Sequence, residues 1–230
     1  MERRICLPEN PTCYQKILAI ELAAILGFEL ESVKFPILDP CGDIVILPAG
    51  ESCPAGAVRR SGKSFVYVAD SRTSVDCVCR SILAHPEQIL DRAGSRRECP
   101  QPAGYQAAPV HDGVQENRKL RPHAGLESFF EHGCFLADED QDWLADHVLV
   151  RILADRSLSV SQTVAAANLA ARIGAETVTL TYPLTVESES GPSPLIRFSS
   201  EGAPGVSVGG EGRRIVTVQG DGVPLEQFSS

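Results

Sequence analysis

Four aspartates close together give this chain its best candidate for chemistry. In the segment Asp138-Glu-Asp140-Gln-Asp142-Trp-Leu-Ala-Asp146, carboxylates occupy loop positions 1, 3, 5 and 9. This spacing suits a hard cation such as Ca²⁺, which takes roughly six to eight oxygen ligands. We therefore predict a calcium site with Asp138, Asp140, Asp142 and Asp146 as ligands. The alternative is a solvated acidic loop that precedes a strand.

The acidic segment resembles the DxDxDGxxxD calcium loops of bacterial surface proteins, which commonly precede a strand. It departs from them at Trp143, which stands where the glycine of those loops makes the sharp turn. Position 12 is Leu149, whereas an EF-hand has a bidentate Glu there. The match is therefore partial.

The other chemically interesting residues form weaker patterns. Cys99, His132 and Cys134 suggest a zinc site, but their spacing fits no known zinc motif, and an exposed His with free thiols is the alternative. The glycine-rich segment 208–212 precedes a strand and reads as a turn. Since no Gly-x-Ser-x-Gly, HExxH or Walker motif is present, we assign no catalytic and no cofactor-binding residue.

The sequence contains an internal repeat, which indicates the helices and strands that position these residues. Residues 4–36 align without a gap on 151–183 at an offset of 147, with about ten of 33 pairs identical. The likeness resumes at an offset of 150, where 62–68 faces 212–218. Such a period predicts two copies of one supersecondary unit.

Each copy opens with a strand and a helix. Thr12 and Ser159 are N-caps with Gln15 and Gln162 three residues on, which is the capping-box pattern. Gly27 and Gly174 are expected to end these helices as C′ residues.

After the helix, each copy continues through three short strands and a second helix. The pattern predicts an α/β fold: two tandem β-α-β-β-β-α sandwich modules arising from an internal duplication. The predicted domains are 1–90 for the first repeat, 91–125 for a basic linker with Pro and Gly, and 126–230 for a short helix, the acidic loop and the second repeat, whose last helix begins at 223–228 and is truncated. The predicted strands are 3–7, 32–38, 44–47 and 64–69, then 148–153, 177–186, 195–198 and 214–219, and the other predicted helices cover 74–83 and 126–130.

The composition of the chain limits which classes of partner it is expected to bind. The net charge of −9 argues against nucleic acid and anionic membrane surfaces. The sequence contains no stretch of about 18 apolar residues, so we predict no membrane span. We expect a cytoplasmic location if the N-terminus is complete and an extracytoplasmic one if the chain is a fragment. Eight irregularly spaced cysteines form no duplicated disulfide framework, and Cys6, Cys77 and Cys79 read as small buried hydrophobes.

A resemblance to a known family rests on five segments: LPENPT, LAAILG, VKFPIL, DIVILPAGE and FVYVADS. In these segments the chain resembles the α/β module of the regulatory subunit of bacterial cellulose synthase. That family is periplasmic, and its modules are structural, so the resemblance implies no catalytic residues. A second likeness is to the diaminopimelate epimerase group, which places a catalytic Cys at the helix start of each half. Here Cys13 has Val160 as its counterpart, so the two-thiol machinery is absent.

Two functions remain open. The first is a non-catalytic structural or binding module of a larger cell-surface or polysaccharide-related protein, with other domains, a protein or a carbohydrate as partner. The alternative is a small-molecule enzyme with its site in the cleft between the repeats. An enzyme would show a tight cluster of perturbed polar groups there.

Overall fold

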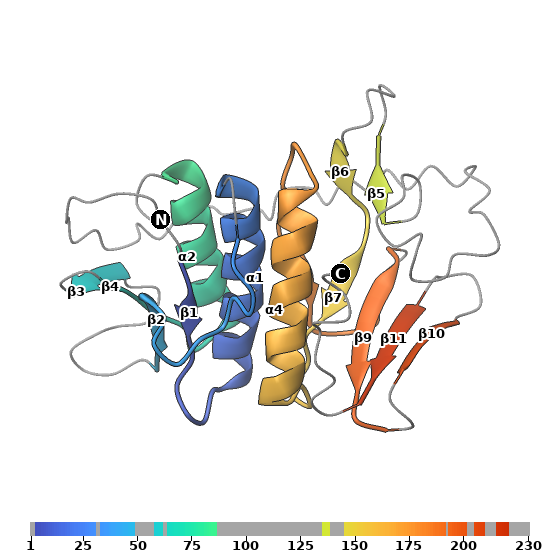
Figure 1. Cartoon of the computed structure of the whole chain (residues 1–230), viewed down its shortest axis with the longest axis horizontal. Coiled ribbons are helices and arrows are strands. Elements are labelled where there is room, and N and C mark those ends of the chain that lie inside the picture. The colour runs from blue at the N-terminus through green and yellow to red at the C-terminus, as the bar shows by residue number, and fades with distance from the viewer. Residues whose placement is uncertain are drawn as a thin grey trace.

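The computed structural model describes residues 3–30, 33–48, 58–61, 64–86, 135–138, 145–191, 193–201, 205–209 and 215–220. Three helices lie side by side in its centre, with one sheet toward each end of the helical layer (Figure 1). The helices are α1 (Cys13–Glu29), α2 (Arg72–Ala84) and α4 (Val160–Ala175). This arrangement confirms the α/β class. Among the described residues, no helix combines the length and apolarity needed to cross a bilayer.

The two sheets share one strand order. The first runs β1-β2-β4-β3, with Leu38 bridged in parallel to Ile5 on the free side of β1. The second runs β8-β7-β9-β11-β10. In each sheet only the last strand, β3 or β10, is antiparallel. The strands are β1 (Ile5–Cys6), β2 (Ile44–Leu47), β3 (Val58–Ser61), β4 (Ser64–Val68), β7 (Arg151–Leu153), β8 (Thr185–Val186), β9 (Leu195–Ser199), β10 (Gly205–Gly209) and β11 (Ile215–Gln219).

A further antiparallel pair, β5 (Leu136–Ala137) with β6 (His147–Val148), flanks the predicted calcium loop. The sequence missed this pair as well as β3 and β10. It predicted 32–38 as a strand, but in the described part only Leu38 bridges to a neighbour.

The register of the two sheets differs by one residue from the sequence alignment of 62–68 with 212–218. In the first sheet Ile44 pairs with Ile5 and with Phe65, whereas in the second Ile196 pairs with Ile152 and with Val216. Phe65 therefore corresponds to Val216, an offset of 151 instead of 150. This matters because a one-residue slip turns every side chain to the other face of the sheet. The pairing at 151 brings buried Phe65 into register with buried Val216.

The turn at 39–43 connects two segments that lie on opposite sides of β1. Leu38 and Ile44 both run parallel to Ile5, on its two sides. The turn therefore crosses over β1. A Cβ on Gly42 would lie 2.7 Å from the Arg4 carbonyl oxygen and 2.8 Å from the Cys6 nitrogen, so only glycine fits at the crossing.

The helical caps are confirmed. The Thr12 and Ser159 hydroxyls accept from the backbone N–H of Gln15 and Gln162, and each glutamine side chain accepts from the backbone N–H of its cap. Ser71 and Ser74 form a third box at the start of α2. Four residues form the buried apolar face of α2: Val75, Val78, Cys79 and Ile82.

Gly27 and Gly174 do not end their helices; each lies inside one, at the contact between α1 and α4. A Cβ on Gly27 would lie 1.9 Å from the Ala171 carbonyl oxygen, and one on Gly174 would lie 2.1 Å from the Ala24 carbonyl oxygen. These glycines allow the two helix backbones to touch. One hydrophobic cluster runs through both halves as a result, with α1 buried from Ile17 to Gly27.

Candidate functional site

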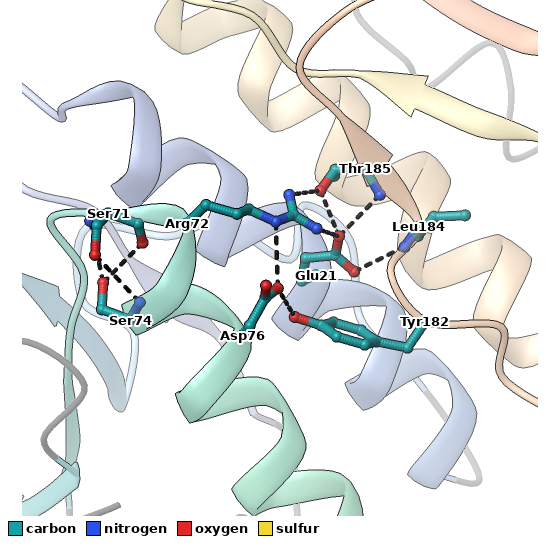
Figure 2. A network of polar contacts seen from close by, with 8 residues as sticks. All are labelled: Glu21, Ser71, Arg72, Ser74, Asp76, Tyr182, Leu184 and Thr185. Carbon is teal, nitrogen blue, oxygen red and sulfur yellow. Dashed lines mark hydrogen bonds and ion pairs between the residues drawn. The ribbon is translucent and has the colours of Figure 1, made fainter. Parts of the chain in front are cut away.

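A polar cluster lies where α1 and α2 meet the segment that leads into β8 (Figure 2). Its centre is Glu21, the one charged side chain in the apolar run 17–26 of α1, and only 1% of it is exposed. The segment on the other side, residues 182–185, belongs to the second repeat. The cluster therefore joins the two halves of the chain.

Every donor around Glu21 comes from the opposite half or from α2. Oε2 accepts from the Leu184 backbone N–H at 3.1 Å, and Oε1 accepts from the Thr185 backbone N–H at 2.8 Å and from the Thr185 hydroxyl. The Arg72 guanidinium lies 3.7 Å from Oε1 and donates to the Thr185 hydroxyl at 2.9 Å. The carboxylate is thus fully hydrogen-bonded, as a buried charge must be.

Arg72 extends the cluster to the protein surface. Its Nε lies 3.2 Å from Oδ1 of Asp76, one turn further along α2, and the Tyr182 hydroxyl donates to the same oxygen at 2.7 Å. The Arg80 guanidinium carbon sits 5.5 Å from the centre of the Tyr182 ring. The capping box of Ser71 and Ser74 fixes the first turn of α2 and with it the position of Arg72 (Figure 2).

Burial shifts the pKa values of three residues in and around this cluster. Desolvation raises the pKa of Glu21, although the Thr185 and Leu184 hydrogen bonds and the charge of Arg72 oppose that rise. Desolvation, with the nearby Cys79 and Glu21, also raises the pKa of Tyr182. Buried Cys79 has a pKa well above its ordinary value for the same main reason. Burial thus favours the neutral forms of Glu21, Tyr182 and Cys79, whereas the hydrogen bonds and Arg72 favour the charged form of Glu21.

A similar contact links α4 to the first half of the chain. At the repeat position of Glu21 stands Asn168, whose Oδ1 accepts from the Ile37 backbone N–H at 2.9 Å. Ile37 is in turn the counterpart of Leu184. A helix side chain of each half thus accepts from the backbone of the other half, once through a carboxylate and once through an amide.

The predicted calcium ligands are only partly described. Asp138 and Asp146 lie at the inner ends of β5 and β6, and the Asp146 backbone N–H donates to the Ala137 carbonyl at 2.7 Å. Asp140 and Asp142 lie outside the described residues, as do Cys99, His132 and Cys134. Within the described ranges no three His, Cys, Asp or Glu side chains gather as a metal site. The prediction of Ca²⁺ binding remains a prediction.

Other predicted features also fall outside the described residues: the linker 91–125, the short helix 126–130 and the last helix at 223–228. Of the cysteines read as buried, Cys79 is buried, whereas Cys6 and Cys77 are half-buried. Cys13, compared above with a catalytic thiol, lies 3.9 Å from the Ala154 carbonyl oxygen, and burial raises its pKa.

Sequence reasoning missed the polar cluster, although a signal for it exists. A single glutamate among nine apolar or small residues in 17–26 is costly to bury without partners, so it predicts a specific acceptor role. No family model, no curated protein and no solved structure matches the chain.

Proposed function

We propose that the chain is a non-catalytic structural or binding module whose two halves arose by internal duplication. Both sheets have the same strand order, and the two interfacial glycines and their alanine contacts are related by the repeat offset of 147. Glu21 with Leu184 and Asn168 with Ile37 obey the same offset. These reciprocal contacts support two copies of one unit packed about an approximate twofold axis.

One observation carries the non-catalytic part of this proposal: the polar groups between the halves bond to one another. Three hydrogen bonds and Arg72 surround the carboxylate of Glu21, and Gly27 and Gly174 bring α1 and α4 into backbone contact. A catalytic carboxylate needs a position from which it can reach a substrate proton. Glu21 instead has the surroundings of a group that fixes one half against the other.

In this proposal the module serves a larger cell-surface or polysaccharide-related protein. Its partners would be other domains of that protein, another protein or a carbohydrate. This part rests on the resemblance to the cellulose synthase regulatory subunit and on the acidic net charge of −9. Titration with cellohexaose, followed by a shift of the melting temperature, tests the carbohydrate as a partner.

The alternative is an enzyme with its site between the repeats. It is favoured by the same cluster, because Arg72 and Asp76 are each 25% exposed and reach the surface beside Tyr182. Perturbed titratable groups at a junction between two halves are typical of active sites. Here the substrate would be a small molecule bound at Arg72, Asp76 and Tyr182.

The two functions are separated by the variants Asp76→Asn and Tyr182→Phe, melted with and without a panel of nucleotides, amino acids and sugar phosphates. A structural cluster predicts lower melting temperatures for both variants and no protection of the wild type by any panel member. An enzyme predicts that some compound raises the melting temperature of the wild type and that the variants lose this rise. Glu201→Gln, at an exposed position, is the control.

A further inference from the structure

The turn that crosses β1 brings two cysteines together. Cys6 is half-buried and follows Ile5 in β1, and Cys41 is exposed in the turn, next to Gly42. The Cys6 sulfur lies 3.2 Å from the Pro40 carbonyl oxygen, and that carbonyl belongs to the peptide bond that joins Pro40 to Cys41. Both thiols are free.

Several contacts fix this juxtaposition. The Asp39 backbone N–H donates to the Ile5 carbonyl at 2.8 Å, and the Asp39 carboxylate accepts from Arg4 and from the Cys41 backbone N–H. The close approach of Gly42 to the backbone of residues 4–6 holds the turn against the strand. Since Arg4 and Cys6 alternate with inward-pointing Ile5, their side chains project on the face where the turn passes.

The Cys6 sulfur lies close to the backbone of Cys41. In a trans peptide the carbonyl oxygen and the following Cα are about 2.8 Å apart, so the Cys6 sulfur is within about 6 Å of the Cys41 Cα. A disulfide holds its two Cβ atoms about 3.5–4.5 Å apart. Closing the bond therefore requires the exposed Cys41 side chain to turn toward Cys6 and the turn to move with it.

We propose that Cys6 and Cys41 are a disulfide-forming pair that ties β1 to the turn crossing over it. With a small-molecule disulfide such as oxidised glutathione as the oxidant, the Cys41 thiolate attacks one glutathione sulfur and releases one glutathione thiolate. The Cys6 thiolate then attacks the Cys41 sulfur and displaces the second. Two protein thiols are oxidised to one disulfide, and the two protons lost go to the two glutathione thiolates.

In this sequence of steps the exposed thiol of Cys41 reacts first with the oxidant. Burial, with the nearby Cys41 and Asp39, raises the pKa of the Cys6 thiol, so it is the weaker first nucleophile. The bond would close a loop of the unfolded chain between residues 6 and 41 and so stabilise the native state.

Peptide mapping of the full chain tests the proposal. Trypsin releases Cys6 in residues 5–16 and Cys41 in residues 35–59, and these peptides also contain Cys13 and Cys53. The experiment therefore uses a Cys13→Ser, Cys53→Ser background, treated with oxidised glutathione, alkylated and digested. We expect the two peptides to be linked and the melting temperature to rise, with both effects reversed by dithiothreitol.

The exposed-site variant Cys41→Ser, in the same background, is expected to lose the linked peptide and the rise in melting temperature. Oxidation in urea, where native geometry is lost, should give mixed pairings of the remaining cysteines. The proposal would be overturned if, after oxidation of the folded protein, Cys6 and Cys41 were both recovered as alkylated peptides. It would also be overturned if either were linked preferentially to another cysteine.

Discussion

Glu21 is a buried residue whose ionisation is linked to folding. Its folded pKa is raised above the ordinary value of 4.5, so the folded state binds a proton more readily than the unfolded state does. Its contribution to stability is therefore largest below that value and falls as the pH rises toward the folded pKa. Above the folded pKa the contribution is constant.

We predict that Glu21→Gln removes this dependence. The free energy of unfolding of the wild type minus that of the variant should fall as the pH rises above 4.5, by at most about 1.4 kcal/mol per pH unit. At neutral pH we still expect the variant to be about 1–3 kcal/mol less stable, because an amide nitrogen would face the donors of Thr185 or Leu184. Urea unfolding across a pH series measures both. A difference that grows with pH would contradict the assignment.

The acidic loop supports a second prediction at the scale of single residues. If Asp138, Asp140, Asp142 and Asp146 bind Ca²⁺, millimolar Ca²⁺ should raise the melting temperature by mass action. The double variant Asp140→Ala, Asp142→Ala should lose that rise. Trp143, the only tryptophan, reports binding by fluorescence. No response up to about 10 mM, beyond the range of weak extracellular sites, would leave a solvated turn.

At this scale the sequence predicted local chemistry well and long-range partners poorly. The capping boxes were readable because their partners are three residues apart. The partners of Glu21, in contrast, lie 163 and 164 residues away in the chain. A lone glutamate in an apolar helix predicts that partners exist, but only the packing of the halves identifies Leu184 and Thr185.

At the scale of the helices, the caps allow a simple test. Thr12→Ala and Ser159→Ala each remove the hydroxyl that accepts from the backbone N–H of the third helical residue. We expect each to lower stability by about 1 kcal/mol, measured by thermal melts. Ser188→Ala, in an exposed part of the chain, is the control and should change little. Unchanged melts for both cap variants would contradict the role of the boxes.

We expect substitutions at the contact between α1 and α4 to lower stability more than substitutions at the caps. Gly27→Ala places a Cβ 1.9 Å from the Ala171 carbonyl oxygen, so the helices must move apart. Alanine gains about 1 kcal/mol of helix propensity. We expect the overpacking, typically about 1–3 kcal/mol or more, to exceed this gain and the melting temperature to fall.

Gly174→Ala should behave like Gly27→Ala, because its Cβ would meet the Ala24 carbonyl oxygen. Gly209→Ala is the matched control, since nothing lies within 4 Å of its Cβ position. If Gly27→Ala melts at or above the wild-type temperature, the two helix backbones do not touch as described.

These glycines show where reading elements from sequence fails. A glycine near the end of an apolar stripe is a good C′ signal when only the local chain is considered. Here close approach of another helix is the stronger requirement, and α1 continues to Glu29. The short strands β3 and β10 were missed for a related reason: each is an antiparallel edge strand defined by pairing with β4 or β11.

At the scale of the whole molecule, the repeat predicted two tandem modules. The structure places α1 between its own sheet's helix α2 and the other half's α4, and a single hydrophobic cluster includes Leu22 of α1 and Ala170 of α4. The segment boundaries 1–90, 91–125 and 126–230 remain predictions. The shared cluster indicates that the halves stabilise each other, since separating them would expose both glycine-contact faces.

Cleavage between the halves tests this interdependence. Limited trypsin digestion within residues 91–125, which contain five arginines and one lysine, should give two fragments that still co-elute in size-exclusion chromatography. The halves expressed alone, 1–90 and 126–230, should show little cooperative unfolding, because each would expose a helix that is buried in the intact chain. In the cleaved protein, Gly27→Ala should promote separation of the fragments, whereas Gly209→Ala should not. Two fragments that separate readily and each melt cooperatively would instead mean that the chain is two independent domains, and that the buried carboxylate of Glu21 is not what holds them together.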